Sequence, residues 1–437
     1  MKIIRILSIA IALLLSCTIL DAQSNLQLEK VVIVSRHGAR APLDEYLKDL
    51  ATLTPQEYKW LQWESNGIQG SDLTPKGAAS ETFFGNYFRM YFNSKGFILQ
   101  DTDVFFGASS KQRTIATARA FAAGLMPLSA IPIEYQKDYS GNYGPLDPDY
   151  LPLFNDHSIS GFDTIKFKKE AEKEVAELIK SLKKPSYDLL EKTLRYPLSD
   201  RAKQTNEPHF KQEVKVQLNF YDSTGKNLEP TMNGDLKIAN KASDAFILQY
   251  YEMEDLEEAA LHNNLSFEEW CQLADTKDYY GKILFTAPII AVNVSHCMLV
   301  RVMSELVSSG HKFSFFCTHD SMIQALLAAL QTKEYSLDNT IEKQTPIGFK
   351  FVIEQWMDTT TGERYMSAKL IYQSSDQMRN MKAFDLTHPP MEYNLSFNGI
   401  EKAPNGYYRY ADFMRHLEDT LSAFQATAKG ENPFPKK

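Results

Sequence analysis

Cysteine is scarce in this sequence, and no metal-binding spacing occurs. The 437 residues contain four cysteines: Cys17, Cys271, Cys297 and Cys317. There is no Cys-x-x-Cys pair and no Cys/His spacing of the kind that binds zinc, so the sequence predicts neither a structural zinc site nor a disulfide-stapled scaffold. Cys317 lies in the apolar run FSFFCT, which indicates a buried free thiol.

An excess of positive charge is also lacking, as are repeats and low-complexity tracts. The net charge is -8, which argues against nucleic acid or an anionic membrane surface as a partner. The missing repeats exclude solenoid and fibrous folds. The length allows a large core and favours two domains over one.

The N-terminus carries the pattern of a secretory signal. Two basic residues precede an apolar run from about residue 6 to 20, and Ala22 follows shortly after. We predict residues 1–22 as a cleaved signal peptide, with export to the periplasm of a Gram-negative bacterium or secretion. The run is short for a membrane span, and none is expected in the mature chain. A lipoprotein anchor at Cys17 is the alternative.

Hydrophobic periodicity predicts strands that alternate with helices at both ends of the chain. The predicted strands are 31–35, 104–107, 313–318, 348–356 and 367–372. The predicted helices are 75–93, 111–124, 167–183, 237–252, 288–309 and 321–330. The last two strands flank a TTTGE turn, which indicates a hairpin at a sheet edge. The pattern predicts an α/β fold with three layers, in which helices flank a mostly parallel central sheet.

The middle of the chain is richer in Lys and Glu and lacks a run of strong strands. We therefore predict a smaller, mostly α-helical insertion domain at 149–282, between two segments of the α/β core domain at 23–148 and 283–437. The segment 167–185 carries charges of both signs beside an apolar stripe, which favours a solvated amphipathic helix over a basic partner-binding helix.

Charged and titratable residues follow three of the predicted strands. They are Arg36, His37 and Arg40 after the first strand, Arg113 in the helix after the second, and His319 and Asp320 after the third. Ligands of parallel sheets bind beyond the carboxyl ends of the strands, where helix N-termini also attract anions. Three guanidinium groups suit an array of oxygens, so the pattern predicts a site for a phosphoryl group.

Each of these signals has a structural explanation when it is taken alone. An Arg-His pair after a strand usually lies on the protein surface without a function, and Arg113 could face solvent. Asp320 could cap its helix, as could Ser109 or Ser110 at the helix after the second strand. The occurrence of all three signals at the same topological position favours the functional interpretation.

The sequence resembles the histidine acid phosphatase family. RHGARAP matches the RHGxRxP signature of that family, and THDS matches its later His-Asp pair. The stretches LTPKG, QRTIATARAFAAGL, DYLPLF, SDAFILQY and YYRYADF also have counterparts there in the same order. The resemblance extends from about Leu28 to about Leu421.

The resemblance implies a phosphatase chemistry that needs no metal or other cofactor. His37 would attack phosphorus and form a phosphohistidine, and Asp320 would protonate the leaving group. The implied phosphate-binding residues are Arg36, Arg40, Arg113 and His319. Gly38 would let the backbone pass close to the phosphate. We also expect the pKa of Asp320, a carboxyl beside an anion site, to lie above that of a free Asp.

The residues near the signature bear on the substrate. Asp44 stands where phytases of the family tend to present a basic residue, and Met322 stands where the enteric relatives usually have Asn. These departures favour a broad phosphomonoesterase with sugar phosphates among its substrates, and a phytase is the alternative. The resemblance also puts Asp244 at the pocket, although a solvent-facing position is equally open.

Two further classes of protein stay open. A non-catalytic exported protein that binds a phosphorylated ligand is disfavoured, because His37 and Asp320 are both intact. A phosphotransferase of the mutase branch would typically use a Glu acid and lack the His-Asp pair. The expected partner is a small phosphorylated substrate, and binding to nucleic acid is not expected. The protein is expected to be a monomer or a homodimer.

Overall fold

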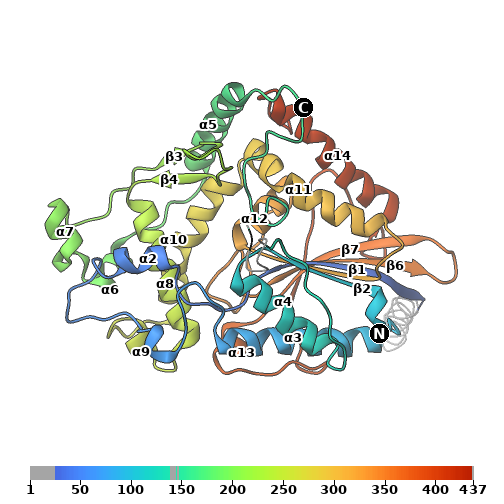
Figure 1. The fold of residues 1–437 in the computed structure, drawn as a ribbon, viewed down its shortest axis with the longest axis horizontal. Coiled ribbons are helices and arrows are strands. Elements are labelled where there is room, and N and C mark those ends of the chain that lie inside the picture. The colour runs from blue at the N-terminus through green and yellow to red at the C-terminus, as the bar shows by residue number, and fades with distance from the viewer. Residues whose placement is uncertain (1–24, 138–143, 145–146, 436–437) are drawn as a thin grey trace, which may run out of the picture.

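A seven-stranded sheet runs through the structure, a computed structural model that describes residues 25–137, 144 and 147–435 (Figure 1). The strand order is β2-β5-β1-β6-β7-β8, and β9 pairs with β7. The strands are β1 (Leu26–Arg36), β2 (Val104–Ala108), β5 (Phe313–Thr318), β6 (Lys350–Asp358), β7 (Arg364–Tyr372), β8 (Met391–Asn394) and β9 (Tyr408–Arg409). The predicted signal peptide at 1–22, with Cys17, lies outside the described residues.

The sheet is mixed, and the prediction of a mostly parallel sheet is wrong. Only β1 and β2 run parallel to β5, while β6, β7, β8 and β9 pair antiparallel with their neighbours. A short turn between β6 and β7 requires these two strands to run in opposite directions. The predicted place of that hairpin at an edge is also wrong, because β6 lies between β1 and β7.

Strand β1 is buried on both faces, which explains its unbroken apolar run. Val31 and Ile33 belong to the apolar cluster on one face of the sheet, and Val32 and Val34 belong to the cluster on the other. None of these four side chains is exposed. Because successive side chains of a strand point to opposite faces, a strand covered on both sides needs apolar residues at every position.

Helices cover both faces of the sheet (Figure 1). One face packs against α3 (Pro75–Ser94) and α4 (Gln112–Leu125). The other packs against α11 (Pro288–Val307), α12 (Asp320–Ala329) and α14 (Tyr410–Ala428). The chain thus forms an α/β fold with a mixed central sheet between helices.

The chain between α4 and α11 is mostly helical (Figure 1). Its helices are α5 (Thr164–Ser181), α6 (Asp188–Leu194), α7 (Asp200–Thr205), α8 (Asp235–Glu252), α9 (Leu256–Ala259) and α10 (Phe267–Phe285). A two-stranded sheet joins β3 (Lys215–Gln217) to β4 (Thr231–Asn233). Two shorter helices, α2 (Asp44–Leu50) and α13 (Ser375–Arg379), lie elsewhere in the chain. The boundaries 149–282 stay a prediction.

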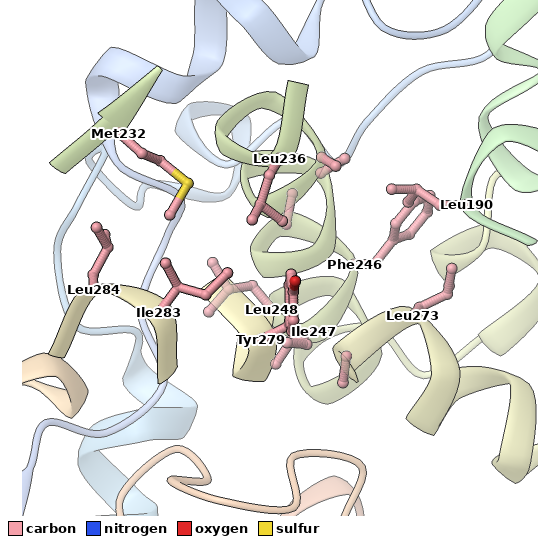
Figure 2. Close-up of a cluster of buried hydrophobic side chains, with 14 of the residues drawn as sticks. Leu190, Met232, Leu236, Phe246, Ile247, Leu248, Leu273, Tyr279, Ile283 and Leu284 are labelled. Atoms are coloured by element: carbon pink, nitrogen blue, oxygen red, sulfur yellow. The ribbon is translucent and has the colours of Figure 1, made fainter. Parts of the chain in front are cut away.

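Apolar side chains of α8 and α10 form the core of this helical region. Figure 2 shows Phe246 and Ile247 of α8 beside Leu273 and Ile283 of α10. Leu50, from the segment that follows β1, belongs to the same cluster. Helix α10 was not among the predicted helices. It begins with a capping box, in which Ser266 and Glu269 each accept a backbone N–H of the other.

Two expectations about composition can be compared with the described residues. Among them, α11 alone is long and apolar enough to cross a membrane, and its buried face packs in the core. Cys271, Cys297 and Cys317 are free thiols in the structure. Cys317 is fully buried on β5, as the sequence predicted.

Candidate active site

Backbone hydrogen bonds bring the ends of the three parallel strands together. The N–H of His37 donates to Thr318 O at 3.1 Å, and the N–H of Ser109 donates to Cys317 O at 3.1 Å. Each bond extends the pairing of β1 or β2 with β5 by one residue. The residues that follow the strands are therefore neighbours, although more than 200 positions separate Ser109 from His319.

His37 is a buried imidazole with one ring nitrogen occupied. Its Nδ1 lies 2.9 Å from Gly38 O, and a carbonyl can only accept, so Nδ1 carries the hydrogen. Nε2 of the neutral ring then keeps its lone pair. Burial, followed by the charge of Arg113, holds the pKa of His37 well below its usual value. The ring therefore stays neutral in mildly acidic solution.

Gly38 is required by packing behind the loop. Its N–H donates to Thr117 Oγ1 at 3.0 Å. An added Cβ would lie 3.1 Å from Gly77 O and 3.2 Å from Leu73 Cδ1 and from Glu81 Cγ. A side chain at this position would therefore crowd α3 and the segment before it, while the expected close approach of the backbone to phosphate stays a prediction.

The three arginines have a feature in common, which Arg89 and Arg201 elsewhere in the described residues also have. The Nε atoms of Arg36, Arg40 and Arg113 are buried and have no hydrogen-bond partner among the described residues. A buried donor without an acceptor is costly, and such donors are rare in folded proteins. Three such donors in one cluster are what a site for a ligand rich in oxygen atoms, such as a phosphoryl group, would offer.

Arg36 is held rigidly at the end of β1. Its Nη1 donates to Glu342 Oε1 at 2.7 Å and to Thr345 O at 2.6 Å, and its Nη2 lies 3.5 Å from Asp320 Oδ2. The side chain is 1 % exposed. Burial alone would lower its pKa, but Glu342 and Asp320 together raise the pKa above its usual value. Arg36 is thus a permanent cation with a defined orientation.

Arg40 reaches the helical region. Its Nη2 donates to Asp244 Oδ2 on α8 at 2.9 Å, and its Nη1 donates to Ala41 O at 2.9 Å. Both charged side chains of this pair are buried. Asp244 was predicted either at the pocket or in solvent, and the structure places its carboxylate on Arg40 and not in solvent.

Arg113 and His319 face each other across the site. Arg113 Nη2 lies 3.5 Å from His319 Nδ1, and an arginine can only donate, so Nδ1 is the acceptor. His319 Nε2 then donates to Ser109 Oγ at 3.2 Å. Burial, followed by the charge of Arg40, lowers the pKa of Arg113 to about 10. The prediction that Ser109 or Ser110 caps α4 is wrong, because Lys111 occupies the N-cap position; Ser109 instead contacts His319.

Asp320 begins α12 and contacts two cations. Its Oδ2 lies 2.5 Å from Lys277 Nζ and 3.5 Å from Arg36 Nη2. Burial raises the pKa of Asp320, but Lys277 and Arg36 outweigh it and hold the pKa well below its usual value. The expectation of a raised pKa is therefore wrong, because it did not include Lys277. Asp320 also accepts the N–H of Ser321, so it partly caps its helix as well.

The sequence interpretation missed Lys277 and Glu342. Lys277 stands on α10 and is 8 % exposed, and Glu342 is 1 % exposed. One signal was available, because Lys277 follows Leu273 by four positions and so lies on the apolar face of its helix. A lysine on the buried face of a helix needs an anionic partner.

The acidic groups near the site differ from those expected. Asp44 is exposed in the first turn of α2, and among the described residues its carboxylate contacts none of the three arginines. Glu229, just before β4, is half-buried and lies within electrostatic reach of Asp320 and Arg113. Burial, followed by Asp320, raises the pKa of Glu229 to about 7. Glu45, the neighbour of Asp44, adds to this effect.

The site and fold agree with the comparisons with known proteins. The profile of the histidine phosphatase superfamily (branch 2) matches residues 27–373. A glucose-1-phosphatase from Providencia rettgeri is 31% identical over 413 residues, covering 92% of this chain and 94% of the relative. Phytase AppA from Escherichia coli is 26% identical over 426 residues, covering 92% and 93%.

The solved structure of Hafnia alvei phytase in complex with myo-inositol hexakis sulphate has the same fold. It superposes with a TM-score of 0.76 at 24% sequence identity, covering 91% of this chain and 97% of that chain. The chain belongs to branch 2 of the histidine phosphatase superfamily. It is an enzyme of the histidine acid phosphatase type, homologous to glucose-1-phosphatases and phytases.

Proposed function

We propose that this protein is an exported acid phosphatase that hydrolyses small organic phosphate monoesters through a phosphohistidine intermediate. The observation that carries the proposal is the state of His37. Its Nδ1 hydrogen bonds to Gly38 O, which leaves Nε2 with a free lone pair beside the buried arginine cluster. The low pKa of this ring keeps it nucleophilic in acid.

The first half of the reaction transfers the phosphoryl group to the protein. The Nε2 lone pair of His37 forms a bond to phosphorus, while the ester P–O bond breaks and its electron pair stays on the leaving oxygen. An alkoxide is a poor leaving group, so Asp320 donates a proton to that oxygen. The organic alcohol then departs.

The second half returns the protein to its starting state. The Asp320 carboxylate accepts a proton from water as the water oxygen bonds to phosphorus. The P–N bond breaks, and its electron pair returns to His37 Nε2. Inorganic phosphate leaves, and Asp320 is protonated for the next cycle.

The arginines and His319 hold the oxygens of the transferred group. Charge spreads over three oxygens in the transition state of phosphoryl transfer, and fixed donors stabilise it without reorganisation. Arg36 is fixed by Glu342 and Arg40 by Asp244. Removing one such donor typically lowers the rate by about 10²- to 10³-fold.

The charges around the site favour substrates with a single phosphate. Glu229 and Glu45 are carboxylic acids near the arginine cluster, whereas Asp244 is already ion-paired with Arg40. Carboxyl groups hydrogen bond well with sugar hydroxyl groups in either charge state, and they supply no positive charge to bind additional phosphates. Sugar phosphates are therefore the proposed substrates, in line with the glucose-1-phosphatase relative. A phytase is the second candidate, supported by the relative named phytase.

The test is phosphate release at acidic pH from p-nitrophenyl phosphate, glucose 1-phosphate and inositol hexakisphosphate. It compares wild type with His37→Ala and Asp320→Asn, with a chelator present throughout. We expect glucose 1-phosphate to exceed the hexakisphosphate in kcat/KM, and His37→Ala to abolish release. The reverse ranking would establish the phytase. No turnover of any substrate by the folded wild type would favour a binding protein that keeps the fold.

Export is part of the proposal and rests on the predicted signal peptide at 1–22. Expression of the full chain in a Gram-negative host, followed by fractionation and N-terminal sequencing, tests it. A mature chain in the periplasm that begins near Gln23 supports the proposal, and a lipid-modified N-terminus at Cys17 contradicts cleavage after Ala22.

A further inference from the structure

A lysine of the helical region contacts the residue proposed as general acid. Lys277 Nζ lies 2.5 Å from Asp320 Oδ2 and 3.4 Å from Glu342 Oε1. The lysine side chain is 10 % exposed. Asp320 begins α12, whereas Lys277 belongs to α10, so the contact joins the sheet side of the site to the helical region.

Four charged groups form a closed ring at this point. Arg36 and Lys277 are the cations, Asp320 and Glu342 are the anions, and each cation contacts both anions. The ring carries no net charge when all four are ionised. Arg36 is the closer partner of Glu342, at 2.7 Å, and Lys277 is the closer partner of Asp320, at 2.5 Å. The main anion for Lys277 is therefore the proposed acid.

Other groups also face Asp320 and contribute to its charge state. They are Arg113 of α4, Glu229 before β4, Tyr280 of α10, and the imidazoles His37 and His319. Among all these groups, only Lys277 and Arg36 lie within 4 Å of the Asp320 carboxylate as ion-pair partners. Arg36 is also proposed to bind the phosphate of the substrate. Lys277 is therefore the ion-pair partner of Asp320 that has no proposed contact with the substrate.

We propose that Lys277 is a positioning residue for the general acid: it fixes the Asp320 carboxyl beside the site and sets the pH at which Asp320 carries the proton for the leaving group. This inference rests on the proposed phosphatase function. When the substrate binds, its negative phosphate offsets the positive charge of Arg36, so the Asp320 carboxyl holds its proton until it donates that proton to the leaving oxygen. In the second half, Lys277 stabilises the Asp320 carboxylate that accepts the proton of water.

The position of Lys277 is rigid enough for this role. Leu273 and Ile283, on the same helix, are buried in the apolar core between α8 and α10 (Figure 2). Asp278, the next residue, accepts the backbone N–H of Lys343 at 3.0 Å and so ties α10 to the segment that carries Glu342. The ammonium group is thus held from two sides.

The test uses Lys277→Met, which keeps the length of the side chain and removes its charge. The alkaline limb of kcat reports the pKa of the acid in the enzyme–substrate complex. With glucose 1-phosphate, we expect this limb to move up by about one pH unit, the usual effect of losing one nearby opposite charge. We also expect kcat at its maximum to fall roughly tenfold, a fraction of the contribution of a general acid.

Two comparisons separate this role from a structural one. The leaving group of p-nitrophenyl phosphate departs without a proton, so kcat/KM for this substrate, which covers only the first half of the reaction, should stay close to wild type. Lys277→Arg keeps the charge and should restore the wild-type limb. Lys241→Met is the matched control, because Lys241 is 9 % exposed and ion-paired with Asp49, away from Asp320.

The outcomes are distinct. An unshifted limb in Lys277→Met, or equal losses of kcat/KM with both substrates, overturns the inference while the phosphatase function stands. No turnover by wild type overturns the proposed function and this inference with it. If Lys277→Met does not fold, Lys277→Gln, which can still donate to Glu342, takes its place with the same expected shift.

Discussion

Asp278 offers a prediction in which a charge can be removed without removing its hydrogen bond. Its carboxyl is 7 % exposed, and Oδ2 accepts the N–H of Lys343 at 3.0 Å. Burial raises the pKa of Asp278 from 3.8 to about 7, against the opposing charge of Lys277. In Asp278→Asn the amide oxygen can accept the same N–H, so the hydrogen bond stays and the titration disappears.

The sign and size of the effect follow from the shift in pKa. A carboxyl whose pKa is raised on folding favours the folded state least when it is ionised, so it destabilises the protein as the pH rises toward 7. Between the unfolded pKa of 3.8 and the folded pKa of about 7, each pH unit costs about 1.4 kcal/mol. The wild-type penalty is therefore about 2 kcal/mol at pH 5 and about 4 kcal/mol at pH 8.

Urea unfolding of wild type and Asp278→Asn at pH 5 and pH 8 measures this difference. We expect the variant to gain about 2–3 kcal/mol relative to wild type between the two pH values. Glu418→Gln on α14, which loses an exposed carboxylate, is the control. A difference between wild type and Asp278→Asn that does not change with pH would refute the reasoning.

Three further predictions concern the site and its support. In wild type, KM for glucose 1-phosphate should rise between pH 6 and 8, because Glu229, with a pKa of about 7, becomes charged and repels the substrate. Glu229→Gln should prevent this rise; a KM profile unchanged from wild type would show that Glu229 does not cause it. Arg113→Ala should lower kcat/KM by about 10²- to 10³-fold at an unchanged melting temperature. Lys350→Met leaves Glu81 buried at 1 % exposure without its cation, so the free energy of unfolding at pH 8 should fall by about 3 kcal/mol or more, and less at pH 5, where Glu81 with a pKa of about 7 is protonated.

The proximity of the candidate site residues was predictable because the signals are local. An apolar run of the kind seen at 31–34 requires a strand covered on both faces. The residue that follows the run must then lie at the carboxyl end of that strand. The same argument applies to His319 after β5 and to Arg113 in the first turn of α4. The carboxyl ends of parallel strands lie at the same end of a sheet, and β1, β2 and β5 are the parallel strands of this sheet.

The direction of the remaining strands was not predictable from their patterns. Strands β6 and β7 have apolar runs like those of β1, and burial on both faces does not depend on strand direction. The TTTGE turn between them is a local signal for antiparallel pairing of these two strands. A two-strand hairpin next to β1 makes the sheet mixed.

The charge state of the proposed acid depends on contacts that sequence distance conceals. Lys277 precedes Asp320 by 43 positions and reaches it only through the packing of α10 against α12. Glu342 follows in an irregular segment with no motif. The proposed role of Asp320 could therefore be predicted from the sequence, whereas the direction of its pKa shift could not. The roles of these residues and the domain boundaries stay predictions.

The measurement that tests the central claim most directly is the capture of the phosphorylated protein during turnover. Wild type is mixed with p-nitrophenyl phosphate, quenched in alkali to preserve a P–N bond, digested, and mapped by mass spectrometry. The account predicts one phosphoryl group on His37, accumulated at a steady level and absent from His37→Ala, which should also lack turnover. Phosphate on another residue, or normal turnover by His37→Ala, would contradict it.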